Sequence, residues 1–189
     1  MVAHPDAPLT PLTSSHAAPS TALDPRAFKD LFRLHPAGVA VVTLAGEDGV
    51  PVGFTATSVI SVSAAPAVLA FSITSISSSW PALREARSAV VSFLAHDQAD
   101  LSVRFATPGI DRFSDVPLTW LPTGEPRLTE VTSWARVEIA ERVPAGASFL
   151  VTAHVTEVHD DATPAQADQP RLVYVDRTYH RTGEQSQVG

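Results

Sequence analysis

The chain contains no cysteine, which excludes disulfide bonds, thiolate zinc sites and a cysteine nucleophile. It also has no basic stripe to neutralise phosphates, since its formal net charge is −7. No apolar run approaches the roughly 20 residues that a membrane-spanning helix needs. We therefore expect neither a nucleic-acid nor a membrane partner, and the absence of cysteine is consistent with a cytoplasmic location.

The remaining composition is that of one globular domain. Of the 189 residues, 44% are hydrophobic and 17% are charged. Residues 1–23 hold four prolines and no Lys or Arg, so they match neither a core-forming segment nor a signal peptide. We predict a disordered N-terminal tail over 1–23, a folded domain over 24–183 and a short C-terminal tail over 184–189.

The seven histidines do not cluster as metal ligands do. His154 and His159 are closest to such a pattern, but strand alternation places them on opposite faces. The sequence therefore predicts no metal site.

Short apolar stretches separated by turn signals dominate the rest of the chain. Val39–Ala45 is a continuous β-branched run, whereas Trp134–Glu141 and Phe149–Thr156 alternate apolar and polar residues. Three short helices are expected, after Asp24-Pro25, around Trp80-Pro81, and after Asp97, which we expect to act as an N-cap. The pattern predicts a mainly β protein, a closed or partly closed barrel with peripheral helices.

Two stretches are rich in hydroxyl side chains and carry no charge. The first reads GFTATSVISVS over residues 53–63, and the second reads SITSISSS over residues 72–79. Because each hydroxyl can donate one hydrogen bond and accept two, the pair suits a neutral cradle for an anionic aromatic ligand. The free N–H groups of the helix at Trp80 would favour a phosphate beside the second stretch. The alternative is that both are ordinary Ser/Thr turns and helix caps.

An ordered set of motifs links these stretches to a known family. The pieces are HPAGVAVVT, GVPVGFTATSVISVSAAPAVLAFSI, SSSWPALREA, VVSFLAHDQADLSVRFA, GIDRF and RLVYVDRTYHR. In this order and spacing they resemble the flavin reductase-like family with an FMN-binding split barrel. The resemblance spans about residues 27–182 and is strongest to the reductase components of two-component flavin monooxygenases.

The resemblance implies a homodimer of six-stranded antiparallel split β-barrels that binds FMN or FAD near the subunit interface. It further implies a flavin reductase in which NADH or NADPH delivers a hydride to free flavin. The reduced flavin would then leave for a partner monooxygenase.

The family's functional segments map onto specific positions of this chain. The first flavin-binding segment corresponds to Thr55, Ala56, Thr57, Ser58 and Ser61. The phosphate side corresponds to Ser77, Ser78 and Ser79. Arg104 and Phe105 match a helix that approaches the flavin, and His180 matches a histidine near the flavin ring and the nicotinamide.

Two departures from the family pattern bear on function. Gly146-Ala147-Ser148 stands where relatives often carry Gly-Asp-His, which is associated with nicotinamide binding. Thr74-Ser75-Ile76 stands where relatives often place a charged or amide residue. The altered Gly146-Ala147-Ser148 run favours one alternative, a flavin-binding protein on the same fold with little or no reductase activity. An oxidase that keeps its flavin bound is a further alternative, because the fold alone does not settle the function.

Overall fold

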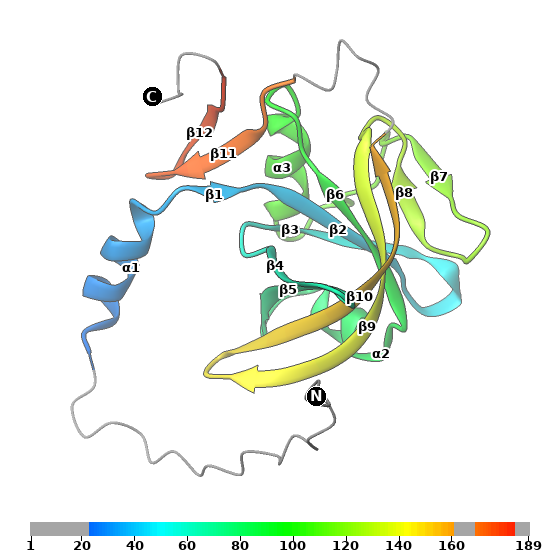
Figure 1. Cartoon of the computed structure of the whole chain (residues 1–189), viewed down its shortest axis with the longest axis horizontal. Helices are drawn as coiled ribbons and strands as arrows, with labels where there is room; N and C mark the ends of the chain where they lie inside the picture. Colours follow the sequence, from blue (N-terminus) through cyan, green and yellow to red (C-terminus); the bar gives the residue numbers. More distant parts are fainter. Residues whose placement is uncertain (1–22, 161–168, 184–189) are drawn as a thin grey trace, which may run out of the picture. The chain divides into compact units, whose positions relative to one another are not determined.

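The computed structural model of the chain describes residues 23–160 and 169–183 (Figure 1). Most of the predicted N-terminal tail, the C-terminal tail and part of the predicted loop after Asp160 lie outside these residues. The chain divides into two compact units, residues 1–32 and residues 33–189. Within the described residues, no helix is long and apolar enough to cross a membrane.

The helix α1 (Pro25–Arg33) begins as predicted. The Asp24 carboxylate accepts a hydrogen bond of 2.9 Å from the backbone N–H of Arg26, which confirms the N-cap. Proline at the first helical position has no N–H to leave unsatisfied.

Seven antiparallel strands form the main sheet, in the spatial order β3-β2-β6-β9-β10-β5-β4. Their bounds are β2 (Ala40–Ala45), β3 (Pro51–Ala56), β4 (Ile60–Ala64), β5 (Ala67–Thr74), β6 (Ser88–Phe93), β9 (Ser133–Ala145) and β10 (Ser148–Asp160). The short 3₁₀ turn η1 (Glu47–Gly49) closes the predicted hairpin between β2 and β3. The mainly β fold is confirmed. The sheet has seven strands where six were expected, because the hydroxyl-rich stretch resumes as the edge strand β4.

The order of the strands requires the sheet to curl. Strands β3 and β4 lie at opposite edges of the sheet, yet only residues 57–59 separate them in the chain. Three residues span at most about 11 Å, far less than the width of seven strands spaced about 4.8 Å apart. The two edges must therefore approach each other, which gives the split barrel. The Ser58 hydroxyl spans this gap by accepting a hydrogen bond of 2.9 Å from the Ser72 backbone N–H on β5.

Strand β2 contributes side chains to two hydrophobic cores, one on each of its faces. Its residues Ala40, Val42 and Leu44 belong to the cluster inside the barrel, together with Phe71 and other buried side chains. Val41 and the preceding Val39 belong to a second cluster on the other face of the sheet. Because both faces of β2 are covered, its sequence is a continuous apolar run rather than an alternating one.

Helix α3 (Ala99–Ala106), a two-stranded hairpin and a small sheet contribute to the second cluster. The hairpin pairs β7 (Leu118–Trp120) with β8 (Pro126–Leu128). The small sheet has the order β1-β11-β12, with β1 (Ala37–Gly38), β11 (Leu172–Val175) and β12 (Thr178–Arg181). Asp176 and Arg177 both have positive φ, 49° and 61°, as the tight turn between β11 and β12 requires.

The predicted cap of α3 is wrong. The N-cap is Gln98 and not Asp97. The Gln98 amide is held on both sides, since its oxygen accepts from the Ala95 N–H at 3.0 Å and its nitrogen donates to the Glu130 carbonyl at 2.9 Å. A side chain that reaches two separate backbone segments fixes where the helix starts, which a local N-cap pattern does not reveal.

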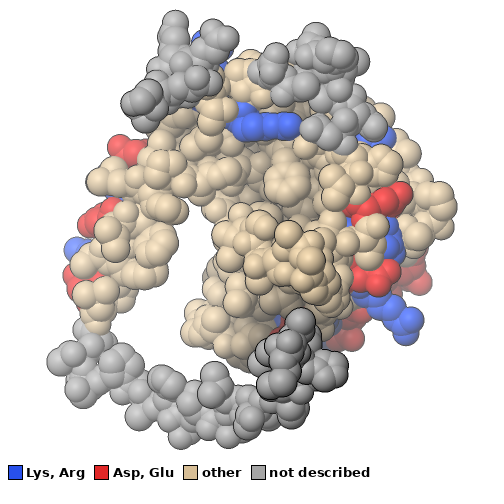
Figure 2. Space-filling model, in the orientation of Figure 1, with Lys and Arg blue, Asp and Glu red and all other residues tan. Residues whose placement is uncertain are grey.

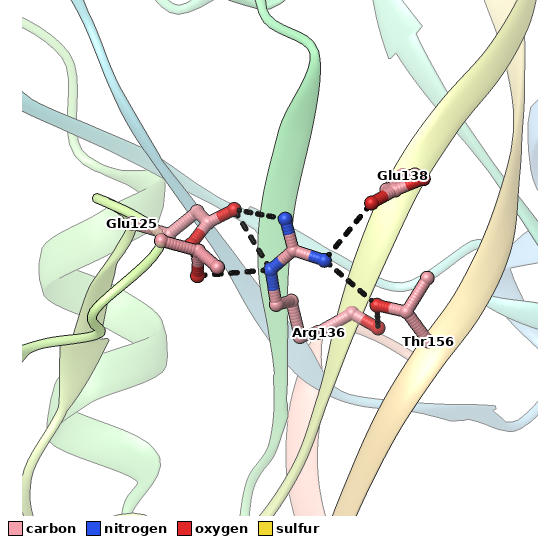
Figure 3. A network of polar contacts seen from close by, with 5 residues as sticks. Glu125, Arg136, Glu138 and Thr156 are labelled. Carbon is pink, nitrogen blue, oxygen red and sulfur yellow. Dashed lines mark hydrogen bonds and ion pairs between the residues drawn. The ribbon is translucent and has the colours of Figure 1, made fainter.

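A buried ion pair joins the β7–β8 hairpin to the main sheet (Figure 3). Glu125 is 2% exposed and lies 3.0 Å from Arg136 on β9. On its other side the Arg136 guanidinium meets Glu138 at 3.2 Å and donates to the Thr156 hydroxyl at 2.9 Å. Burial by itself would raise the pKa of Glu125, but hydrogen bonds from Ser88, Thr123 and Arg136 hold that pKa below its usual value.

We expect Arg136→Leu to lower the free energy of unfolding by about 3–5 kcal/mol at neutral pH, because Glu125 is left buried without its partner. Urea denaturation measures this change. Arg84→Leu is the matched control. Arg84 pairs with Glu85 at 2.8 Å, but both side chains are exposed, so its loss should cost about 0–1 kcal/mol. Equal effects of the two substitutions would contradict the importance of the buried pair.

The same ion pair predicts a pH dependence. Because the folded-state pKa of Glu125 is depressed, its contribution is complete above the unfolded-state value of about 4.3 and is lost as the pH falls through the folded-state pKa. The difference in stability between the parent and Arg136→Leu should therefore narrow in acid. A difference that stays constant from pH 7 to pH 3 would show that Glu125 is not the group responsible.

Candidate functional site

The first hydroxyl stretch lies at the gap between the two edges of the sheet. Thr55 is half-buried on β3, and its hydroxyl donates to the Ser102 carbonyl of α3 at 2.6 Å. The Ser58 hydroxyl is occupied by β5, as described above. The structure leaves Thr57 and Ser61 exposed, with no hydrogen bond to their hydroxyls among the described residues. These two side chains are therefore available to a ligand, whereas Ala56 is buried and can offer only its backbone.

The second stretch meets β3 from the other side. Ser79 is 1% exposed, and its hydroxyl donates to the Gly53 carbonyl at 3.1 Å. The Ser77 hydroxyl accepts from the Ser79 N–H at 3.3 Å, and Ser78 is exposed. Ser78 and Ser79 line a small cavity of about 170 Å³ beside Gly53. The two stretches that the sequence places apart thus come together on β3.

Arg112 supplies a positive charge to this cavity. Its Nη1 donates to the Gly53 carbonyl at 2.8 Å and to the Ser79 hydroxyl at 3.1 Å, and its Nε donates to the Thr107 carbonyl at 3.0 Å. Burial lowers the pKa of Arg112, but a guanidinium remains protonated at neutral pH. Sequence reasoning included this arginine in the GIDRF motif and gave it no role.

The expected helix N-terminus contributes less than predicted. The helix α2 (Trp80–Glu85) has six residues, and Ser79 stands at its N-cap without a side-chain capping bond. Ser79 is engaged with Gly53 instead. A helix of this length has a weak dipole, so the charge at this end of the site comes from Arg112.

Two predicted contacts play supporting roles here. Phe105 is fully buried, and its ring lies against Gly53, where an added Cβ would come within 2.8 Å of it. It meets Phe113 edge-on at 5.0 Å. Phe105 therefore packs beneath Gly53, and a contact between Phe105 and the flavin stays a prediction. Arg104 donates to the Ser114 carbonyl at 2.8 Å and so anchors the loop that carries Arg112.

His180 lies on β12, and its side chain is exposed. The neighbouring Tyr179 places its hydroxyl 2.8 Å from the Ser102 hydroxyl on α3. Ser102 in turn accepts the Thr55 hydroxyl through its carbonyl. Two hydrogen bonds therefore connect the strand of His180 to the first hydroxyl stretch, although more than 120 residues separate Thr55 from His180 in the sequence.

The altered run Gly146-Ala147-Ser148 forms the turn between β9 and β10, with Gly146 at a positive φ of 62°. The Ala147 carbonyl accepts from both the N–H and the hydroxyl of Ser75, each at 3.0 Å. The turn is thereby tied to the segment just before Ser77. The turn therefore carries neither the acid nor the histidine that relatives often have at this position. Among the described residues, no three His, Asp or Glu side chains are grouped as a metal would require.

The model of the flavin reductase like domain matches residues 32–183. The chain belongs to this family.

Several relatives of the chain are named as reductases. An NADH:FMN oxidoreductase of Rhodococcus qingshengii is 44% identical over 156 residues, which cover 82% of this chain and 80% of that protein. The reductase component of a 4-nitrophenol monooxygenase from Rhodococcus opacus is 33% identical over 71% of this chain and 72% of its own. The crystal structure of a flavin reductase domain protein from Arthrobacter sp. FB24 superposes with a TM-score of 0.75 at 34% identity, over 83% of this chain and 94% of that one.

Gly53 offers a direct test of how closely this flavin reductase domain is packed below its site. We expect Gly53→Ala to lower stability by about 1–3 kcal/mol, because the new methyl group would have to displace the buried ring of Phe105. Thermal unfolding measures the change. Gly38→Ala is the matched control, since an added Cβ there meets nothing within 4 Å. A Gly53→Ala protein as stable as Gly38→Ala would contradict this packing.

Proposed function

We propose that this protein is an NADH-dependent flavin reductase that reduces free FMN and releases it to a partner monooxygenase. The observation that carries the proposal is the site along β3, with the exposed Thr57 hydroxyl just beyond the end of the strand and with Ser78 and Arg112 lining the cavity beside Gly53. Family membership and the names of the relatives support the same activity. The match to an NADH:FMN oxidoreductase favours FMN over FAD and NADH over NADPH.

The donors at the site fit a flavin mononucleotide. Thr57, Ser61 and Ser78 keep their hydroxyls free of internal hydrogen bonds among the described residues. The hydroxyls of Thr57 and Ser61 can meet the polar edge of an isoalloxazine ring, and the hydroxyl of Ser78 can meet a phosphate. Arg112 lies beside Ser78 in the cavity and can balance a phosphate. We assign the ring to the end of β3 and the phosphate to the cavity beside Gly53.

When bound, the flavin supplies the redox chemistry by accepting a hydride from the nicotinamide. The protein's contribution is then to bind and orient the two rings and to exclude water. The hydroxyls of the cradle hold the flavin without a strong charge clamp, since two of Arg112's donors are already used by Thr107 and Gly53. Such binding suits a flavin that must dissociate after reduction.

His180 is the residue that we assign to the nicotinamide. Its exposed imidazole stands on the strand that Tyr179 ties to α3, the helix that also accepts the Thr55 hydroxyl. It can pack against a ring or donate to the carboxamide. It need not transfer a proton, because protons for the reduced flavin can come from water.

A cytoplasmic location, expected from the cysteine-free sequence, stays a prediction.

NADH oxidation under air, with and without added FMN, tests the proposed activity. We expect oxidation that depends on added FMN, and we expect His180→Ala to raise the KM for NADH and lower kcat/KM by about tenfold or more, or about 1.4 kcal/mol. A parent protein that binds FMN but oxidises neither NADH nor NADPH would favour the flavin-binding alternative, which the altered run Gly146-Ala147-Ser148 also favours. Oxidation that proceeds at full rate without added flavin would favour an oxidase.

Flavin binding provides a second prediction. We expect Thr57→Val and Ser78→Ala each to weaken FMN binding by about 0.5–1.5 kcal/mol, because each removes a hydrogen bond to the ligand. Titration calorimetry measures the affinity. Thr119→Val, on the exposed strand β7, is the control and should bind FMN as the parent does. If FMN affinity is unchanged in both cradle variants, the site assignment is wrong.

We also propose that two copies of the chain associate. Ile60 and Val62 on β4 are 57% and 55% exposed, and the cross-strand pair Val143 and Leu150 is 44% and 40% exposed. In Figure 2 the middle of the visible face is largely tan, and the coloured Lys, Arg, Asp and Glu side chains lie around it. Exposed apolar side chains in such number favour an interface. The edge strand β4 follows the cradle directly, so this interface would adjoin the flavin.

Sedimentation velocity of the full chain with FMN should show a dimer at micromolar concentration. Replacing Ile60 and Val62 together with aspartate should give a monomer, because a charge buried in an interface is costly. A parent protein that sediments as a monomer would rule the dimer out.

A further inference from the structure

The contact between Tyr179 and Ser102 is a hydrogen bond between two side-chain hydroxyls and not only a packing contact. The two hydroxyls are 2.8 Å apart, and Ser102 is fully buried. Ser102 also accepts the Thr55 hydroxyl through its carbonyl at 2.6 Å. One residue of α3 thus holds the strand of His180 with its side chain and the first cradle residue with its backbone.

The geometry of a strand carries this restraint to His180. Consecutive side chains point to opposite faces, so the inward Tyr179 leaves His180 on the exposed face. The tyrosine side chain has only two rotatable bonds before its ring, and that ring packs against Tyr174 at 5.1 Å. Strand β12 is an edge strand that pairs with β11 alone. The hydroxyl of Tyr179 therefore fixes a strand that has no second neighbour in its sheet.

We propose that the Tyr179–Ser102 hydrogen bond sets the distance between His180 and the flavin cradle. Tyr179 and Ser102 are then positioning residues for the nicotinamide. This rests on the proposed function. Neither side chain need touch a substrate. Tyr179 acts through His180, and Ser102 acts through Tyr179.

Substitutions at the two hydroxyl residues test this. Tyr179→Phe and Ser102→Ala each remove one partner and leave the other hydroxyl without its bond. The double variant removes both, which can restore much of the stability that either single variant loses. Tyr174→Phe is the matched control, since it removes a hydroxyl from the adjoining ring and no described residue forms a hydrogen bond with that hydroxyl.

We expect both single variants to raise the KM for NADH by about fivefold or more, while their affinity for FMN stays within about twofold of the parent. The double variant should show a KM raised as much as in the single variants, although its melting temperature recovers. Tyr174→Phe should match the parent. In a His180→Ala background, Tyr179→Phe should change the KM no further.

The inference is overturned if Tyr179→Phe lowers the melting temperature but leaves the KM for NADH unchanged, because the contact is then structural only. It is also overturned if Tyr174→Phe raises the KM equally, or if Tyr179→Phe adds a full further effect to His180→Ala. Where a single variant fails to fold, the KM of the double variant for NADH is compared with that of the parent instead. A raised KM supports the inference, and an unchanged KM overturns it. A parent that oxidises neither NADH nor NADPH refutes the proposed function, whereas an active parent with an unaffected Tyr179→Phe variant refutes this inference alone.

Discussion

The short connection between β3 and β4 is the constraint on which the rest of the structure depends. Strands at opposite edges of a seven-stranded sheet are joined by residues 57–59, so the sheet has to curl until its edges meet. The curl encloses the cluster around Phe71 and exposes Thr57 at the meeting point. The same connection thus closes the barrel and presents a candidate flavin-binding hydroxyl.

Charge is used differently in the fold and in the site. Arg136 is fully engaged, with Glu125 and Glu138 as ion-pair partners, and it holds the β7–β8 hairpin to the sheet. Arg112 has no carboxylate partner among the described residues and donates to neutral oxygens instead. A guanidinium with neutral partners keeps its net charge available for an anion, whereas a paired one does not. This difference separates the candidate phosphate site from a structural ion pair.

Most of the fold could be predicted from the sequence because its signals are local. The continuous run of Val39–Ala45 and the alternation of Trp134–Glu141 correspond to strands, and the Asp24-Pro25 cap is present. The strand β4 was harder to predict, because its exposed side chains alternate weakly and its pairing with β5 includes a bulge.

The site was only partly predictable, since its parts meet through long-range contacts. The hydroxyl stretches could be found by composition, but which hydroxyls are free depends on partners such as Ser72 and Ser102. Phe105 matched a flavin-binding helix by position, yet it faces the core because Gly53 leaves room for its ring. The roles of Arg112 and Tyr179 depend on contacts 59 and 77 residues away along the chain, which no local pattern encodes.

Hydrogen exchange of the backbone amides with and without FMN tests the central claim most directly, because it locates the ligand on the chain without requiring turnover. The account predicts that FMN slows exchange in residues 55–61, 77–79 and 109–113, and leaves the β7–β8 hairpin unchanged. Protection confined to the β7–β8 hairpin, or no protection at saturating FMN, would contradict the claim that the flavin binds where the two edges of the sheet meet.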